Sequence, residues 1–348
     1  MGEFAKSLVR DSQMRWLGPE KGITHMAAGA VINAAWDLIS KNAGKPLWKY
    51  LSDLSPEEIV DLVDFRYITD YISPEEALAI LNKAKVNRAE NEKELLANGL
   101  PAYTTSAGWL GYSDEKMVRL AKEAVADGFK LIKLKCGTNL EDDKRRLKLA
   151  REAIGPDVKL AIDANQVWDV NDAIKWINDL GDVNLHWVEE PTSPDDVLGH
   201  ATIAKAIAPV RVATGEHVMN RIIFKQLVQA KSFSFMQVDA SRVAGMNENI
   251  AMLLMAAKAG IPVCPHAGGV GLCEMVQHVA MFDFVAVGGK HPDRVVEFVD
   301  HLHEHFVVPT DIRNAHYMPP LKSGAGAEMF EKSISDFTFP TGKEWVNV

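Results

Sequence analysis

The chain is short of cysteine, of basic charge and of long apolar runs, and each shortage excludes a class of protein. Its 348 residues hold three cysteines, Cys136, Cys264 and Cys273, which form no CxxC pair and fit a reducing compartment. The best apolar run, 250–263, is interrupted by Lys258, so no segment qualifies to span a bilayer. A net charge of −9 argues against non-specific binding to nucleic acid. We therefore expect neither nucleic acid nor a membrane among the partners.

The amino-terminal end is not expected to act as a secretory signal, because residues 1–3 do not open an apolar core. Lys6, Arg10 and Arg15 share the basic character of a mitochondrial address, but acidic residues nearby weaken it. The sequence therefore predicts a soluble intracellular protein, with the cytoplasm as the default and mitochondria as the alternative. The sequence leaves open whether the protein forms a homo-oligomer.

The length of the chain and the spacing of its apolar residues predict how it divides into domains. A chain of 348 residues, 47% hydrophobic and 24% charged, can hold one barrel-sized domain and an accessory piece. Residues 1–100 are predicted to be mainly helical, with helices near 26–51 and 74–98 and a strand-like segment at 65–68. Turn residues at 44–46 are expected to stop the first of these helices.

After residue 100 short apolar strands alternate with amphipathic helices, which is the rhythm of a parallel sheet or barrel. The eight expected strands lie near 102–106, 129–135, 159–163, 185–189, 210–214, 235–239, 261–265 and 294–299. Residues 101–320 are predicted to form the catalytic barrel, and residues 321–348 a tail packed on the barrel or the cap. The predicted fold class is α/β: a TIM-like (β/α)7β barrel with a partial, mainly helical N-terminal cap.

Charged side chains stand at the ends of six of these strands, at intervals of 23 to 28 residues. They are Lys133, Lys135, Asp163, Glu189, Glu216, Asp239 and His266. A parallel barrel places the carboxyl ends of all its strands on one face. The spacing therefore predicts that these side chains converge on a single site, which favours an enzyme.

Lys133 and Lys135 are two residues apart on a strand, so both point into the barrel while Ile132 and Leu134 point outward. Two like charges side by side are costly to bury. Both a like-charged neighbour and partial desolvation lower the pKa of a lysine, which suits one of the pair to act as a base. The alternative is a frayed strand with solvated lysines.

Asp163, Glu189 and Glu216 bring three carboxylates from successive strand ends. Ligands that are all oxygen favour a hard cation, Mg²⁺ above all, and disfavour zinc. Solvated or salt-bridged acidic residues are the alternative for each taken alone. Asn165 lies two residues past Asp163 and is expected to reach the same cavity. Glu190 is expected to point away from it.

Asp239 and His266 end two neighbouring strands. A carboxylate bonded to one imidazole nitrogen fixes the tautomer and raises the basicity of the other nitrogen. The glycines that follow at 268, 269 and 271 allow a ligand to approach the backbone closely. A core histidine paired with an aspartate is the alternative interpretation.

With these residues in place, the chain resembles the enolase superfamily and, within it, the L-fuconate dehydratase group. The resemblance covers nearly the whole chain. The matching stretches are 133–135, 163–166, 187–196, 213–217, 237–239 and 264–274, with further matches at 16–22, 35–38, 65–70 and 103–106. The KxK pair, the acid triad and the Asp/His pair are specific to the superfamily, whereas 190–196 and 266–274 point to the group.

The resemblance implies a hydro-lyase, a Mg²⁺-dependent dehydratase that converts L-fuconate to 2-dehydro-3-deoxy-L-fuconate. Asp163, Glu189 and Glu216 would hold the Mg²⁺ that binds the carboxylate of the acid sugar and stabilises the enediolate. Lys135 would remove the proton next to that carboxylate. His266, oriented by Asp239, would act as the acid for the departing 3-hydroxyl. The substrate-binding residues it implies are Lys133, Asn165, Glu216, His266, Ala267, Gly268 and Glu297.

The resemblance also implies that the β-rich first half of the capping domain lies outside this sequence, which opens in the helical half. We therefore expect the metal site to persist but substrate affinity and exclusion of water to suffer. Alternatives are another sugar acid, a racemase of the same superfamily, a Schiff-base aldolase using Lys133 or Lys135, and a non-catalytic paralogue acting through protein contacts.

Overall fold

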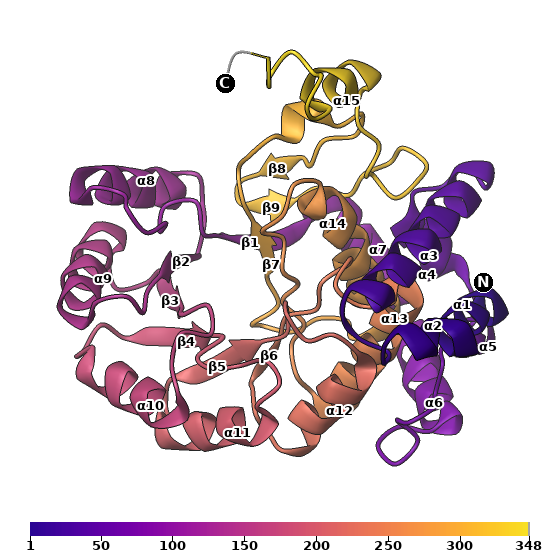
Figure 1. Ribbon diagram of the computed structural model, residues 1–348, viewed down its shortest axis with the longest axis horizontal. Helices are drawn as coiled ribbons and strands as arrows, with labels where there is room; N and C mark the ends of the chain where they lie inside the picture. Colours follow the sequence, from indigo (N-terminus) through magenta and orange to yellow (C-terminus); the bar gives the residue numbers. More distant parts are fainter. Residues whose placement is uncertain (347–348) are drawn as a thin grey trace.

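The computed structural model describes residues 1–346, and its amino-terminal part is a layer of helices (Figure 1). They are α1 Gly2–Arg10, α2 Ser12–Leu17, α3 Gly22–Asn42, α4 Leu47–Asp53, α5 Pro56–Asp61, α6 Pro74–Lys85 and α7 Arg88–Asn98. Ser55 and Ser73 begin α5 and α6 with a capping box, each followed directly by a proline. Among the described residues no helix combines the length and apolarity that a bilayer crossing requires.

Two local predictions for this layer are wrong. The helix expected over 74–98 is divided at Val86 and Asn87, both weaker helix formers than their neighbours. The strand expected at 65–68 is a series of turns. There the Arg66 N–H donates to Asp64 Oδ1 at 3.0 Å, a local bond that competes with strand pairing.

The following strands run parallel in the order β6-β5-β4-β3-β2-β1, with β7 paired to the other side of β1. Their bounds are β1 Leu100–Thr104, β2 Leu131–Lys135, β3 Lys159–Asp163, β4 Leu185–Glu189, β5 Arg211–Thr214, β6 Phe235–Met236 and β7 Val296–Phe298. Helices cover their outer side: α8 Asp114–Ala126, α9 Leu140–Ile154, α10 Val170–Asp179, α11 Val197–Ala206, α12 Arg221–Gln229, α13 Gly245–Ala259 and α14 Leu272–Phe282 (Figure 1). The predicted α/β fold is confirmed.

The seventh strand, expected at 261–265, is reduced to one bridge between Val263 and Met236. Single backbone bonds continue on both sides of that bridge. The Cys264 N–H donates to the Met236 carbonyl at 2.8 Å, and the Glu297 N–H donates to the Pro265 carbonyl at 3.1 Å. This extended segment thus links β6 to β7, where the ladder of strands is open.

The interior of the strands has an apolar floor. Each of the strands β1 to β6 and the extended segment after α13 contributes one buried residue to it: Tyr103, Leu131, Ala161, Trp187, Ala213, Phe235 and Cys264. Lys133 lies two residues beyond Leu131 on the same face of β2, whereas Ile132 and Leu134 pack in the outer core against the helices. The predicted alternation is therefore confirmed. The charged side chains occupy the next layer above an apolar floor that excludes water.

The carboxyl-terminal segment contacts the helical layer. After the hairpin of β8 Ile312–Arg313 and β9 His316–Tyr317, which pairs with β1, residue Gly324 bridges to Pro46. The Ala325 N–H donates to Asp37 Oδ1 on α3 at 2.7 Å. Short elements complete the chain: a π-helix at Asp283–Val287, a 3-10 helix at His303–His305 and α15 Glu331–Phe337.

His278 on α14 joins the barrel to the helical layer and predicts an acid sensitivity. Its Nδ1 accepts the Trp48 N–H at 3.2 Å, and burial lowers its pKa to about 3. The unfolded chain takes up this proton near pH 6.5, so the stability is retained above that pH and lost as the pH falls toward 3. His278→Gln keeps an acceptor for Trp48. Between pH 6.5 and pH 5, the free energy of unfolding of His278→Gln should fall by about 2 kcal/mol less than that of the unaltered protein, as measured by urea unfolding. Equal losses would contradict this.

Candidate active site

Three carboxylates meet at the carboxyl ends of β3, β4 and β5. Strand register sets this arrangement, because Asp163 is paired with Glu189 across β3 and β4. Glu216 follows β5 by two residues. One oxygen atom from each of the three lies within 4.8 Å of those of the other two, and all three residues are buried. Burial raises the pKa of Glu189 and Glu216, and nearby carboxylates add to the rise. A set of oxygen donors this crowded fits a hard divalent cation.

Lys133 is enclosed by carboxylates. Its Nζ contacts Glu189 Oε1, lies 3.0 Å from Glu297 Oε1 and lies 3.6 Å from Asp163 Oδ2. Burial alone would lower its pKa, but the negative charge of Glu189 and Glu297 outweighs burial and raises it well above the usual value. The expectation of a lowered pKa is therefore wrong for Lys133, because these acids outweigh any effect of a neighbouring lysine. This ammonium is held as a fixed positive charge.

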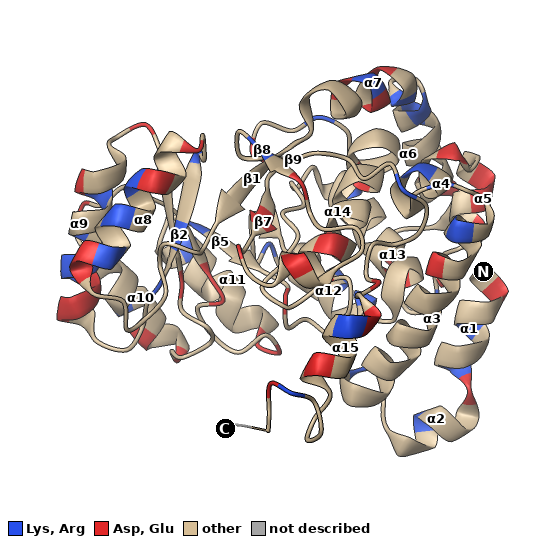
Figure 2. Cartoon of the chain, turned by 90° about the horizontal axis from the view of Figure 1, so that it is seen from above, with Lys and Arg blue, Asp and Glu red and all other residues tan. Residues whose placement is uncertain are grey.

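Lys135 is less enclosed than Lys133. Its Nζ lies 2.5 Å from Asp163 Oδ2, and its side chain is 14% exposed against 1% for Lys133. The ammonium also lies 5.4 Å from the centre of the Trp109 ring. Arg146, which is buried, donates to the carbonyls of Lys135 and Trp109. It therefore joins the end of β2 to the loop between β1 and α8. Figure 2 shows basic positions in blue on β2 and acidic positions in red near β7.

Asp239 and His266 form the expected pair. Asp239 Oδ2 bonds to His266 Nδ1 at 2.8 Å, and Asp239 Oδ1 accepts the backbone N–H groups of Ser241 and Arg242. His266 Nε2 lies 3.4 Å from Glu216 Oε2. Burial would lower the pKa of His266, but the bond to Asp239 and the surrounding carboxylates raise it to about 9. The raised pKa favours the protonated imidazole at neutral pH, whereas the Gly268 N–H points at Nε2 at 3.1 Å, a contact that only the neutral ring can accept.

The remaining candidate residues line the same region. Glu297 Oε1 accepts Thr105 Oγ1–H at 2.6 Å, and Glu297 Oε2 accepts the Ala267 N–H at 3.0 Å. Gly268 lies so close to His266 that a Cβ there would stand 2.7 Å from its Nε2. Asn165 is exposed, adopts a φ of 46° and donates its N–H to Asp163 Oδ1 at 2.8 Å. The structure therefore brings all the sequence-predicted site residues to one end of the barrel.

Sequence reasoning missed several residues at this end. Gln237 donates to Glu189 Oε2 at 2.6 Å, and its position two residues before Asp239 on one strand was the available signal. The prediction that Glu190 points away is wrong: its carboxylate groups with Glu216 and His217, each offering an atom within 4.8 Å of the others. The reason is a left-handed φ of 43° at Glu190, which breaks the alternation of β4.

Comparisons with known proteins agree with this geometry. The family model described as enolase C-terminal domain-like matches residues 116–333. Mitochondrial enolase superfamily member 1 of Bos taurus is 53% identical over 344 residues, which cover 98% of this chain and 78% of that protein. L-galactonate dehydratase of Hypocrea jecorina is 48% identical over 351 residues, covering 99% of this chain and 77% of that protein.

Solved structures show the same fold. The crystal structure of human mitochondrial enolase superfamily member 1 superposes with a TM-score of 0.97 at 52% identity, covering 99% of this chain and 78% of that one. L-talarate/galactarate dehydratase from Salmonella typhimurium LT2, liganded with Mg and L-lyxarohydroxamate, has a TM-score of 0.70 at 25% identity, covering 95% of this chain and 75% of that one. The chain belongs to the enolase superfamily.

Proposed function

We propose that this protein is a Mg²⁺-dependent acid-sugar dehydratase that converts L-fuconate to 2-dehydro-3-deoxy-L-fuconate. One observation carries the proposal: the three-carboxylate group lies between a partly exposed lysine, Lys135, and an imidazole paired with an aspartate, His266. Such an arrangement would offer a base, a cation site and an acid to one bound substrate. Elimination of water next to a carboxylate needs these three groups together.

Asp163, Glu189 and Glu216 are the residues that would hold Mg²⁺, because they offer oxygen donors within one ion's reach and are buried. When bound, the ion would supply positive charge to the substrate carboxylate and to the negative charge that develops as the C2 proton leaves. The ammonium of Lys133, fixed among Glu189 and Glu297, offsets part of the negative charge of the site.

Lys135 is the better candidate for the base that takes the C2 proton. Lys133 is enclosed and its pKa is raised well above the usual value, so it cannot readily lose a proton. Lys135 is partly exposed and contacts one acid, Asp163, as its close ion-pair partner. Its neutral form would accept the proton from C2, and the electron pair of that C–H bond would move toward the carboxylate.

His266 would donate its Nε2 proton to the 3-hydroxyl as the C3–O bond breaks. Water leaves, and the enol that remains tautomerises to the 2-keto-3-deoxy acid. Asp239 supports this role, since its bond to Nδ1 leaves the opposite ring nitrogen directed toward Glu216. Glu297 bonds to the Ala267 N–H and so keeps the following loop against the site.

L-fuconate is favoured among the acid sugars by the resemblance of 190–196 and 266–274 to its dehydratase group. L-galactonate, the substrate named for the relative from Hypocrea jecorina, differs from L-fuconate only by a hydroxyl at C6. The test incubates the purified chain and Mg²⁺ with L-fuconate, L-galactonate, L-talarate and galactarate, and traps the 2-keto product with semicarbazide. Turnover of L-fuconate above the others supports the proposal. Racemised substrate, or binding of Mg²⁺ without product, would refute it.

His266→Asn separates the two chemical steps. Because Lys135 remains, the variant is expected to exchange the C2 proton of L-fuconate with D2O while dehydration falls by about 10²–10⁴-fold. Proton NMR of the recovered substrate measures the exchange, and the semicarbazide assay measures the product. Loss of both reactions in equal proportion would assign His266 to proton abstraction instead.

A further inference from the structure

A chain of three side chains lies beside the acid group without belonging to it. His217 Nδ1 bonds to Glu190 Oε1 at 2.7 Å and lies 3.2 Å from Glu216 Oε1. Gln166 Nε2 donates to both oxygens of Glu190, at 3.1 and 3.0 Å. The Glu190 residue is fully buried, so these contacts provide its side-chain partners in place of water.

The same three residues tie together the loops that carry the acid group. Gln166, Glu190 and His217 come shortly after or directly beside Asp163, Glu189 and Glu216 on β3, β4 and the loop after β5. Gln166 and Glu190 adopt left-handed φ values of 67° and 43°. Residues other than glycine hold this conformation only where their surroundings stabilise it. The Gln166 N–H supplies part of that support by donating to the Glu190 carbonyl at 2.8 Å.

Glu216 stands between two imidazoles. Its Oε1 faces His217 Nδ1 at 3.2 Å and its Oε2 faces His266 Nε2 at 3.4 Å. On one side, the His217 N–H therefore lies between two buried carboxylates that would otherwise repel each other, those of Glu190 and Glu216. The orientation of Glu216 thus depends on a group that does not itself belong to the acid triad.

We propose that His217 and Glu190 are positioning residues that set the Glu216 carboxylate for a divalent cation. The inference rests on the cation site of the proposed function and adds residues to it. Partners of metal-binding side chains orient them, and their loss weakens metal affinity by about 10–100-fold. Removing the His217 N–H leaves Glu190 and Glu216 facing one another, and Glu216 turns away from Asp163 and Glu189.

The experiment measures binding of Mn²⁺ alone, by electron paramagnetic resonance of the free ion, to the full chain and its variants. His217→Leu is expected to bind about 10–100-fold more weakly than the unaltered chain. His217→Gln keeps an N–H donor and is expected to recover most of that loss. In the double variant His217→Leu/Glu190→Gln no unpaired charge faces Glu216, so it is expected to bind more tightly than His217→Leu. His305→Leu, which removes a half-buried histidine bonded to Ser333 in the carboxyl-terminal segment, is the matched control.

The outcomes separate this inference from the proposed function. If the unaltered chain does not bind Mn²⁺, the cation site of the proposed function fails and the inference fails with it. If that chain binds and His217→Leu binds equally or more tightly, the inference alone is overturned. Circular dichroism checks folding. If His217→Leu is unfolded, tighter Mn²⁺ binding by His217→Gln than by the double variant supports the inference, and equal binding overturns it. Equal losses in His217→Leu and His305→Leu would also overturn it.

Discussion

Replacing Lys135 with methionine is expected to abolish most of the dehydration of L-fuconate, by about 10²–10⁴-fold in kcat. The reason is that methionine keeps the length and apolar contacts of the lysine stem but has no amine to accept the C2 proton. The nearby Lys133 is not expected to substitute, because its ammonium is enclosed by Glu189, Glu297 and Asp163. The semicarbazide assay with Mg²⁺ measures the loss.

Two comparisons make this result specific. Lys130→Met removes an exposed lysine directly before β2 and should leave turnover unchanged. Exchange of the C2 proton with D2O should vanish in Lys135→Met, in contrast to His266→Asn, which should retain it. A Lys135→Met protein that still dehydrates the substrate within tenfold of the unaltered chain would show that another group removes the proton.

The sequence predicted the central sheet well because two regular patterns determine it. One is the two-residue alternation within each strand, and the other is the even spacing of strands along the chain. Alternation along β2 separates Lys133 and Lys135 from Ile132 and Leu134, and the structure places these pairs on opposite faces. The bounds of β3 and β4 agree with the predicted 159–163 and 185–189. A parallel register then brings strand ends of equal position together, so side chains far apart in sequence become neighbours without a long-range signal.

The features that escaped prediction depend on contacts that no local pattern records. The segment 65–68 has strand-forming residues, but it lies among helices and follows Asp64, whose side chain bonds to its backbone. The seventh strand is reduced to a bridge between Val263 and Met236, with single backbone bonds to its neighbours in place of a regular ladder. The group around Glu190 and His217 required a left-handed backbone at the end of β4, which alternation cannot foresee.

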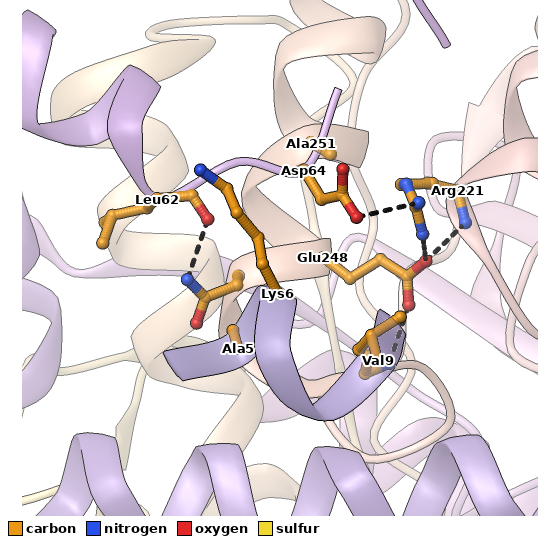
Figure 3. A pocket seen from close by; sticks show the side chains of 10 residues that line it. Ala5, Lys6, Val9, Leu62, Asp64, Arg221, Glu248 and Ala251 are labelled. Carbon is orange, nitrogen blue, oxygen red and sulfur yellow. Dashed lines mark hydrogen bonds and ion pairs between the residues drawn. The ribbon is translucent and has the colours of Figure 1, made fainter. Parts of the chain in front are cut away.

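Buried charges also join the barrel to the helical layer. Arg221, the first residue of α12, is 2% exposed. Its guanidinium lies 3.1 Å from Glu248 Oε1, 3.3 Å from Glu20 Oε2 and 3.3 Å from Asp64 Oδ2. Figure 3 shows Arg221 directed toward Asp64 and Glu248 at the edge of a small pocket that Ala5 and Val9 also line.

Arg221→Met is expected to lower the free energy of unfolding by about 3–5 kcal/mol at pH 7, because removing one partner of a buried ion pair leaves uncompensated charge. Urea unfolding followed by circular dichroism measures the change. Lys225→Met on the same helix is the matched control. Lys225 pairs with Asp70, whose side chain is 58% exposed, and donates to the Tyr67 carbonyl, so its loss is expected to cost less, about 1–2 kcal/mol.

The pH dependence identifies the origin of the Arg221 effect. Burial would raise the pKa of Glu248, but His25 and Arg221 lower it to about 2. A carboxylate with a lowered pKa stabilises the fold above its unfolded pKa of about 4.5, and this contribution is lost as the pH falls toward 2. The variant lacks part of that contribution, so the difference between the two proteins should shrink as the pH falls below 4.5. A difference that stays constant from pH 7 to pH 3 would assign the loss to packing of the arginine stem rather than to its charge.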